Sequence, residues 1–552
     1  MLGASMPSST RPSPALVMTK RPSDQTPPAL QTIDHLHNLY SVLLQGPLQR
    51  AEQMQSVAIE SPSGLSYRFE DLHRASGRIA NWLRSLGLAQ GDRVAAQVEK
   101  SPEAVMLYLA TIRAGFVFLP LNTAYRAGEI GYFLEDATPA VVICSPENRE
   151  WIAPLARRSG CRVLETLGET RDGSLLQAAA GFADDSPIAP TGPDALAAIL
   201  YTSGTTGRSK GAMLTHRNLA SNAMVLHRVW HWQSGDVLLH ALPIFHVHGL
   251  FVALHGALLN ASKIIWLSRF ELDAVIGALP GATLMMGVPT FYVRLLGDSR
   301  FNRQLVKHMR LFISGSAPML AETHLAFTER TGHRILERYG MSETVMLTSN
   351  PYEGDRRAGT VGHPLPETEL RLVCAQTSRI ITRPVSGEAS EIGGVEVRGP
   401  NVFIGYWNMP QKTQEEFTSD GWFKTGDVGQ WDESGYLALV GRSKDLIITG
   451  GYNVYPKEVE GLLDEWPGVA ESAVFGVPHP DFGEAVTAVV VARPGIDLEV
   501  EAIKACLRES IANYKVPKQI HLLESLPRNV MGKVQKNLLR ERFGPASRGA
   551  VA

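Results

Sequence analysis

The sequence has few cysteines, no long apolar runs and almost no net charge. Its four cysteines (Cys144, Cys161, Cys374 and Cys506) lack the spacing of metal ligands, which favours unpaired thiols in a reducing compartment. The net charge is −2, from 53 basic and 55 acidic side chains, so charge gives no reason to expect binding to nucleic acid or a membrane. The longest apolar runs, such as residues 104–110, are far too short to cross a bilayer. We therefore expect a cytoplasmic location.

The length and composition are those of a globular protein with more than one core. A chain of 552 residues is expected to divide into at least two domains, and its composition of 44% hydrophobic and 20% charged residues is ordinary. Residues 1–33 are rich in Ser, Pro and Thr, and we expect them to be disordered. A mitochondrial targeting role for this extension stays open. Residues 544–552 are expected to form a loose tail.

The first half of the chain alternates helical and strand patterns. Apolar residues at spacings of three and four predict helices over 67–84 and 101–114. Short apolar runs at 116–121 and 141–144 predict buried strands. This alternation favours an α/β fold with a mostly parallel sheet covered by helices.

A loop rich in Gly, Ser and Thr follows the buried strand at 195–200. It reads Tyr201-Thr-Ser-Gly-Thr-Thr-Gly-Arg-Ser-Lys-Gly211, which lacks the Gly-Lys-Ser/Thr of a Walker loop. Its glycines allow backbone N–H groups to approach an anion, and its hydroxyls and Lys210 add donors and positive charge. The loop therefore predicts a phosphate site, with a flexible surface loop as the alternative.

This loop resembles the phosphate-binding signature of the adenylate-forming superfamily, which includes acyl-CoA synthetases, luciferases and peptide-synthetase adenylation domains. Further motifs follow in the order of the superfamily: residues 335–344, 425–427, 441–460 and 526–536. The resemblance covers residues 36–541. It implies an α/β fold with a large N-terminal adenylation domain (34–442), built of mixed sheets and a small β subdomain, and a small mobile α+β domain (443–543).

The resemblance also implies an ATP and AMP site. Tyr339 would stack on adenine, Asp427 would bind the ribose, and Arg442 would reach the ribose or the phosphate. Thr202 and Glu343 would hold Mg²⁺, which prefers one or two carboxylates together with phosphate oxygens. The residues assigned to ATP or AMP are Thr202, Ser203, Gly204, Thr205, Thr206, Gly207, Lys210, Ser316, Ala317, Glu337, Arg338, Tyr339, Gly340, Met341, Thr344, Asp427, Arg442 and Lys533.

Two histidines lie at the spacing of metal ligands, His246 and His248. A zinc site would need a third ligand, and none is near in the sequence. The superfamily places an aromatic or histidine gate beside the acyl pocket at the position of His246, and a packed histidine is the alternative. Ser314, Gly315 and Met341 are expected to line the same pocket.

The C-terminal motifs imply a change of domain orientation between two half-reactions. Lys533 matches the catalytic lysine of adenylate formation, and Lys444 matches the hinge. Rotation about the hinge would bring Gly450, Gly451 and Tyr452 to the site for coenzyme A. The implied reaction joins a carboxylic acid to CoA through an acyl-adenylate, with Lys533, Thr202, Glu343 and His246 as catalytic residues and ATP, CoA and Mg²⁺ as required small molecules. We expect a monomer or weak dimer.

Within the superfamily, the chain most resembles malonyl-CoA synthetases (malonate–CoA ligases). The similar stretches are residues 201–214, 240–250, 287–292, 337–344 and 449–458. A dicarboxylate needs a cation for its distal carboxylate, and Arg294 is the predicted partner because its helix follows the turn expected to line the pocket. The alternatives are methylmalonate or another short-chain or aromatic acid, with Arg294 only a surface residue. An ATP-binding protein without turnover is the rival from another class.

Overall fold

The computed structural model describes residues 38–202, 209–384, 387–449, 452–529 and 532–544. The predictions for residues 1–33 and for almost all of the tail at 544–552 lie outside these ranges. Among the described residues, no helix combines the length and apolar character needed to cross a membrane.

The first α/β layer is a six-stranded sheet. Its strands run in parallel, except that the last one pairs antiparallel with its neighbour. In spatial order they are β6 (Val163–Thr166), β5 (Val141–Cys144), β3 (Arg93–Gln97), β4 (Val117–Pro120), β7 (Leu196–Thr202) and β8 (Lys210–Thr215). The helices within this part of the chain are α4 (Phe69–Ser85), α5 (Pro102–Arg113), α6 (Ala127–Ala137), α7 (Arg149–Arg158) and α8 (Ser174–Ala180).

The second layer is a nine-stranded sheet, whose central strands are parallel. Its order is β15 (His363–Pro364), β14 (Thr348–Ser349), β13 (Leu336–Tyr339), β12 (Leu311–Ser314), β11 (Leu284–Gly287), β9 (Val237–His240), β10 (Lys263–Trp266), β1 (Val57–Glu60) and β2 (Ser66–Arg68). The helices are α1 (Leu39–Leu43), α2 (Gln45–Gln49), α3 (Ala51–Met54), α9 (His216–Val229), α10 (His255–Leu259), α11 (Leu272–Ala278), α12 (Pro289–Leu296) and α13 (Ala321–Thr331). One apolar core joins both layers.

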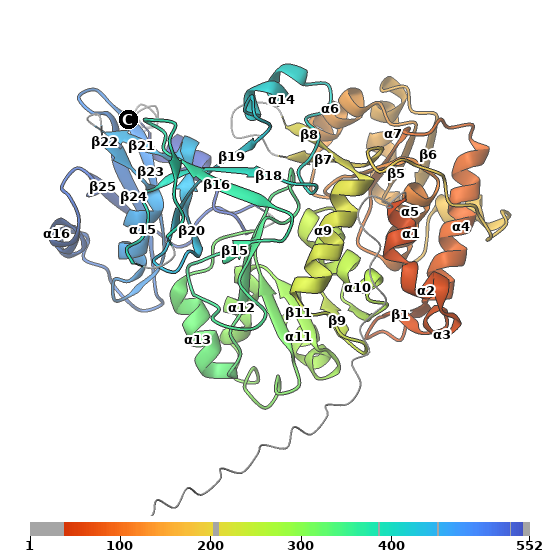
Figure 1. The fold of residues 1–552 in the computed structure, drawn as a ribbon, viewed down its shortest axis with the longest axis horizontal. Coiled ribbons are helices and arrows are strands. Elements are labelled where there is room, and N and C mark those ends of the chain that lie inside the picture. The colour runs from red at the N-terminus through yellow and green to blue at the C-terminus, as the bar shows by residue number, and fades with distance from the viewer. Residues whose placement is uncertain (1–37, 203–208, 385–386, 450–451, 530–531, 545–552) are drawn as a thin grey trace, which may run out of the picture.

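An antiparallel sheet of five strands follows these layers in the chain. Its order is β17 (Ile380–Ile381), β16 (Glu369–Val373), β18 (Gly393–Arg398), β19 (Phe423–Trp431) and β20 (Leu437–Arg442), and α14 (Pro410–Glu416) lies between β18 and β19 in the sequence. This sheet lies beside the C-terminal unit, on the side of the molecule away from α4 and α5 (Figure 1).

The C-terminal unit has its own sheet and its own apolar clusters. The strands are β21 (Ile447–Thr449), β22 (Tyr452–Val454), β23 (Val469–His479), β24 (Gly483–Ala492) and β25 (Gln519–Leu523), and the helices are α15 (Pro456–Asp464), α16 (Val500–Ser510) and α17 (Lys536–Phe543). The predicted α/β class, with a large N-terminal part of mixed sheets and a small α+β part, is confirmed. The boundary between residues 442 and 443 stays a prediction.

One detail differs from the expected local structure. The helix predicted over 67–84 begins at Phe69, because Tyr67 and Arg68 pair with β1 instead. The phosphate-loop signature is not followed at once by a helix. It joins two antiparallel strands, β7 and β8, and α9 begins only at His216, after the Thr215 side chain accepts a hydrogen bond from the Asn218 N–H.

Candidate functional site

The two ends of the phosphate-loop signature face each other across the β7–β8 hairpin. Thr202 and Lys210 are paired in register, and the Thr202 hydroxyl donates to the Lys210 carbonyl at 3.5 Å. The predicted contacts of Ser203, Gly204, Thr205, Thr206 and Gly207 lie outside the described residues. The structure therefore describes only the residues on either side of this segment, including Thr202 and Lys210.

Lys210 belongs to a charged cluster that reaches Glu343. Its ammonium lies 4.3 Å from the centre of the Tyr406 ring and 3.5 Å from Glu416. The Tyr406 hydroxyl donates to the Glu343 carboxylate at 3.0 Å. Glu343 is buried, and desolvation raises the pKa of its carboxyl above the usual range. A cation bound here would stabilise its charged form.

The predicted ribose residue, Asp427, is buried between two other predicted site residues. The Tyr339 hydroxyl donates to one carboxylate oxygen at 2.5 Å, and Arg442 contacts the other at 2.9 Å. Asp427 and Arg442 face each other in the β19–β20 register. Desolvation and the negative charge of Asp427 raise the pKa of Tyr339, so its hydroxyl stays a donor.

The C-terminal unit brings Lys533 toward this cluster. Gly532, whose φ is +73°, lies so close to α12 that an added β-carbon would come within 3.5 Å of the Thr290 side chain. A second contact joins Arg493 to Glu322 of α13 at 2.7 Å. The Lys533 residue is exposed to solvent, but the protein around its amine partly desolvates it. This desolvation lowers the pKa of the amine, and the charge of Arg442 lowers it further. Asp427 and Glu343 act in the opposite direction.

The histidine segment lies against the turn that follows β12. The His246 ring accepts a hydrogen bond from the His248 N–H at 3.3 Å, and the His248 ring lies 3.2 Å from the Ser316 hydroxyl. Burial lowers the pKa of His246 to about 3, so its ring is neutral near pH 7. Among the described residues, no group of three or more His, Cys, Asp and Glu side chains is arranged to hold a metal ion.

Arg338 is a buried cation whose hydrogen-bonding groups are not all paired. It is only 3% exposed, and its Nε and Nη2 atoms are buried without a hydrogen-bond partner. Its guanidinium lies against Gly315, where an added β-carbon would come within 2.4 Å of Nη1. Burial lowers the pKa of Arg338 to about 9. The neighbouring charges that act on His246 and His248 include Arg338, so this cation lies near the histidine segment.

Arg294, the predicted partner of the acyl substrate, has a different environment. It is exposed on α12, and its guanidinium carbon lies 5.9 Å from the centre of the Phe270 ring. The helix begins at Pro289, and Tyr292 and Leu295 occupy its buried face. Arg294 therefore lies off the buried face of α12, and its pairing with the acyl substrate stays a prediction.

The remaining predicted residues surround the ends of β12 and β13. Ser314 is paired in register with Glu337, and each has a buried oxygen without a hydrogen-bond partner. Desolvation raises the pKa of Glu337 to about 8. After β13, the Thr344 N–H donates to the Met341 carbonyl at 3.1 Å, and Gly340 has no room for a side chain because Val345 lies against it. Ala317 is half-buried after Ser316.

The hinge and CoA predictions fall on the boundary of the C-terminal unit. Lys444 is exposed, and the adjacent Asp445 pairs with Arg540 of α17 at 2.8 Å. Tyr452 is 58% exposed and stacks on Tyr514 at 4.6 Å. Gly450 and Gly451 lie outside the described residues.

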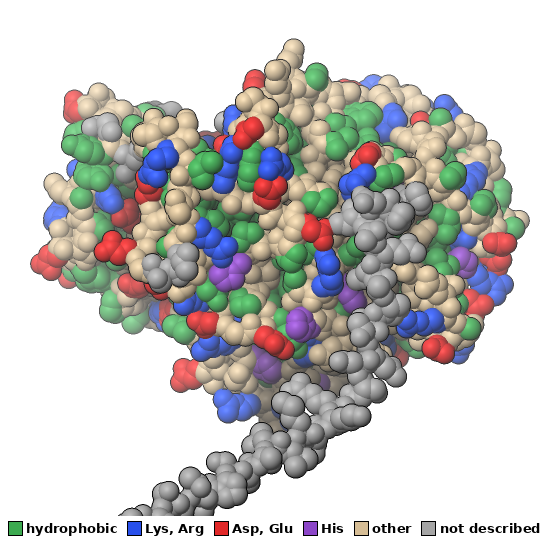
Figure 2. Space-filling view, in the orientation of Figure 1, with side chains coloured by type: hydrophobic (Ala, Val, Ile, Leu, Met, Phe, Trp, Pro, Cys, Tyr) green, Lys and Arg blue, Asp and Glu red, His purple; other side chains and the backbone are tan. Residues whose placement is uncertain are grey.

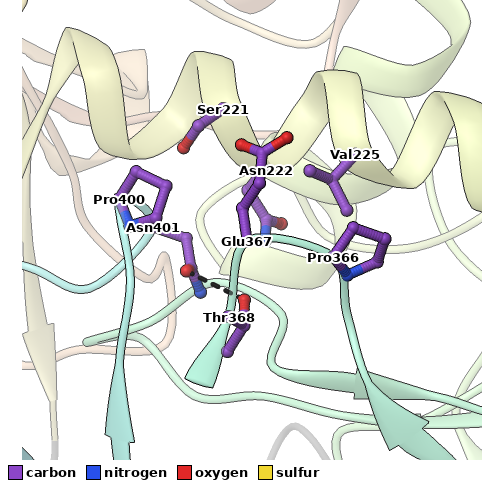
Figure 3. Close-up of a pocket in the computed structure, with 8 residues that line it drawn as sticks. All are labelled: Ser221, Asn222, Val225, Pro366, Glu367, Thr368, Pro400 and Asn401. Carbon is purple, nitrogen blue, oxygen red and sulfur yellow. Dashed lines mark hydrogen bonds between the residues drawn. The ribbon is translucent and has the colours of Figure 1, made fainter. Parts of the chain in front are cut away.

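A small hollow lies between α9 and the segments at residues 366–368 and 400–401, and its polar side chains serve the structure (Figure 3). In it, the Thr368 hydroxyl donates to the Asn401 side chain at 3.1 Å. Asn401 also donates to the carbonyls of Thr344 and Met346, and Asn222 of α9 donates to the latter. These contacts hold the segment that follows Glu343. On the face shown in Figure 2, acidic and basic side chains are interspersed.

Comparison with known proteins identifies the family of this chain. The family "AMP-binding enzyme" matches residues 48–407, and "AMP-binding enzyme C-terminal domain" matches residues 458–533. A malonate–CoA ligase from Arabidopsis thaliana is 35% identical, with 82% of this chain and 78% of that protein covered. A feruloyl-CoA synthase from an Amycolatopsis species is 36% identical, with 90% and 98% covered.

A solved structure gives the same result over most of the chain. ATP-bound MatB from Rhodopseudomonas palustris is 51% identical, with a TM-score of 0.88 and coverage of 92% of this chain and 99% of that chain. The chain belongs to the AMP-binding enzyme family, and it is an AMP-forming CoA ligase.

Proposed function

We propose that the protein joins malonate to coenzyme A in two steps, through malonyl-adenylate, with release of pyrophosphate and then AMP. The observation that carries the choice of acid is Arg338, a buried guanidinium with two unpaired nitrogen atoms beside the histidine segment. The similarity to a malonate–CoA ligase supports the same acid. Release of pyrophosphate from ATP that requires malonate, measured without CoA, tests the first step.

The two steps follow from the chemistry of carboxylates. A carboxylate resists nucleophilic attack because it is negatively charged and has a poor leaving group. Attack of its oxygen on the α-phosphorus of ATP expels pyrophosphate and gives a mixed anhydride. The thiol of CoA then attacks the acyl carbon and expels AMP. Because charge builds up on phosphate oxygens in the first step, Lys533, Lys210 and Thr202 would act mainly by positioning and electrostatic stabilisation.

The distal carboxylate of malonate would pair with Arg338. An uncompensated buried charge is costly, and a planar guanidinium binds a carboxylate through two parallel hydrogen bonds. Gly315 allows the guanidinium to lie against the end of β12, because any side chain there would collide with it. Neutral His246, together with Met341, would bound a short pocket. In this proposal Arg338 takes the role that the sequence predicts for Arg294. The similarity to a feruloyl-CoA synthase keeps an aromatic acid as the alternative.

We also propose a magnesium site at Glu343 and Thr202. The buried carboxyl of Glu343, destabilised as an anion by desolvation, suits a bound cation. The ion would neutralise charge on the phosphates of ATP. Glu343→Gln is expected to increase the Mg²⁺ concentration for half-maximal adenylation about tenfold, from the loss of one charged ligand. A magnesium titration at saturating ATP measures this. An unchanged titration curve would assign the ion to other groups.

Lys533 should make adenylation sensitive to alkaline pH. Only its protonated form supplies positive charge, and its pKa is lowered from the ordinary value of a lysine. Adenylation should therefore be lost, as pH rises, at a lower pH than the ordinary lysine value of about 10.4. Lys533→Arg keeps its charge and should shift this loss to higher pH. A profile of pyrophosphate release from pH 7 to 11 tests this, and the same alkaline loss in both proteins would assign it to another group.

The second half-reaction would use the other face of the C-terminal unit. We propose that Lys444 is the hinge and that Tyr452, with Gly450 and Gly451, approaches the site when CoA reacts. The exposure of Lys444 and Tyr452 supports this assignment. A cytoplasmic location and a monomeric or weakly dimeric state stay predictions.

A further inference from the structure

Helix α6 contacts both ends of the phosphate-loop signature, although none of its residues belongs to the motifs. The Tyr201 hydroxyl, at the end of β7, donates to the Asp136 carboxylate at 2.5 Å. The Tyr132 hydroxyl donates to the backbone carbonyl of Ser209, just before β8, at 2.8 Å. Tyr132 and Asp136 are four residues apart, so they share one face of the helix.

The C-terminal end of α6 is also connected to the start of β8 through hydrogen bonds of Trp407. The Asp136 carbonyl accepts hydrogen bonds at 3.0 Å from the Trp407 indole and from the Asn408 side chain. The Trp407 backbone N–H in turn donates to the Gly211 carbonyl at 2.8 Å. The Asp136 carboxylate thus contacts β7 directly. The Asp136 backbone carbonyl is connected to β8 through Trp407.

Further contacts join α6 to its neighbours in the fold. Its C-terminal carbonyls at Ala137 and Thr138 accept hydrogen bonds from Arg93 of β3 at 2.8 and 3.0 Å. The rings of Phe133 and Tyr201 pack with their centres 4.5 Å apart. Burial and the charge of Asp136 also raise the pKa of Tyr201, which keeps its hydroxyl protonated as a donor.

We propose that Tyr132 and Asp136 are positioning residues for the phosphates of ATP. They act on residues next to the anchored ones: Thr202 follows Tyr201, and Lys210 follows Ser209. Since Thr202 and Lys210 face each other in register, a shift at either anchor changes the separation of their polar groups. The proposal rests on the assignment of Thr202 and Lys210 to the phosphates.

Comparing the affinities for ATP and for AMP tests this proposal. The double variant Tyr132→Phe/Asp136→Ala removes both side-chain anchors and leaves every motif residue in place. Its affinity for ATP is expected to fall about tenfold, the effect of losing one or two hydrogen bonds, whereas its affinity for AMP stays within about twofold. The single variant Asp136→Asn keeps an oxygen acceptor for Tyr201 and should keep most of the wild-type affinity for ATP. Isothermal titration calorimetry measures each value.

The matched control is Glu135→Gln on the same helix, because Glu135 is exposed and pairs with Arg158 at 3.0 Å. It should leave both affinities unchanged. Equal losses for ATP and AMP, or unchanged affinity for ATP in a variant that melts at the wild-type temperature, would overturn the proposal. Binding needs no acid, so failure of malonate as a substrate would be seen separately, as wild-type protein that binds ATP but releases no pyrophosphate with malonate.

Discussion

Lys533→Ala should slow formation of malonyl-adenylate by about 100- to 1,000-fold, the usual effect of removing a donor that stabilises transition-state charge. The same variant should keep nearly wild-type formation of malonyl-CoA from supplied malonyl-adenylate. The difference arises because the α-phosphoryl group gains charge only in the first step. Lys533 lies near Asp427, Glu343 and Arg442 in the present domain orientation, which suits that step. Malonate-dependent release of pyrophosphate and thioester formation, measured separately, give the two rates.

Lys504→Ala is the control for a lost lysine in the C-terminal unit. Lys504 lies on α16 and pairs with Glu501 at 3.2 Å, so its removal should leave both rates unchanged. If Lys533→Ala slows both half-reactions to the same extent, the division of labour between the two steps is wrong.

Arg338→Met should reduce kcat/KM for malonate by about 100- to 5,000-fold, because breaking a buried ion pair costs about 3–5 kcal/mol. Activity with a monocarboxylate such as propionate should fall much less, since propionate has no distal charge to pair. The melting temperature of the ligand-free variant should not fall, because its wild-type guanidinium is buried with two unpaired nitrogen atoms. Steady-state kinetics with both acids and a thermal melt test these outcomes.

Arg294→Met is the matched control for Arg338→Met. Because Arg294 is exposed and lies against Phe270, its removal should change kcat/KM for malonate by less than about threefold. A selective loss of malonate activity in Arg294→Met, with Arg338→Met unaffected, would restore the assignment made from the sequence.

The two arginines differ in how much of their surroundings the sequence predicts. Arg338 lies within the motif at 335–344, and the sequence predicted a role in AMP binding for it. Position alone did not reveal that its guanidinium lies behind Gly315 with unpaired nitrogen atoms. Arg294 was favoured because its helix follows the expected pocket turn. The orientation of that helix depends on Tyr292, whose hydroxyl donates to the Ile313 carbonyl in the neighbouring strand at 2.6 Å.

The elements were predicted better than the contacts between them. The strand at 141–144 was predicted with the observed bounds, because an apolar run is a local signal. The anchors on α6 have no such signal. Asp136 and Tyr201 are 65 residues apart, and only the folded sheet brings them together.

Whether the protein joins malonate to CoA is tested by ATP- and CoA-dependent thioester formation. Malonate, methylmalonate, succinate, acetate, octanoate, benzoate and ferulate would be compared side by side at equal concentration. We expect the highest kcat/KM for malonate, with methylmalonate next and the monocarboxylates far lower. Preference for benzoate, ferulate or another monocarboxylate would keep the adenylation chemistry but contradict the pairing of a distal carboxylate with Arg338.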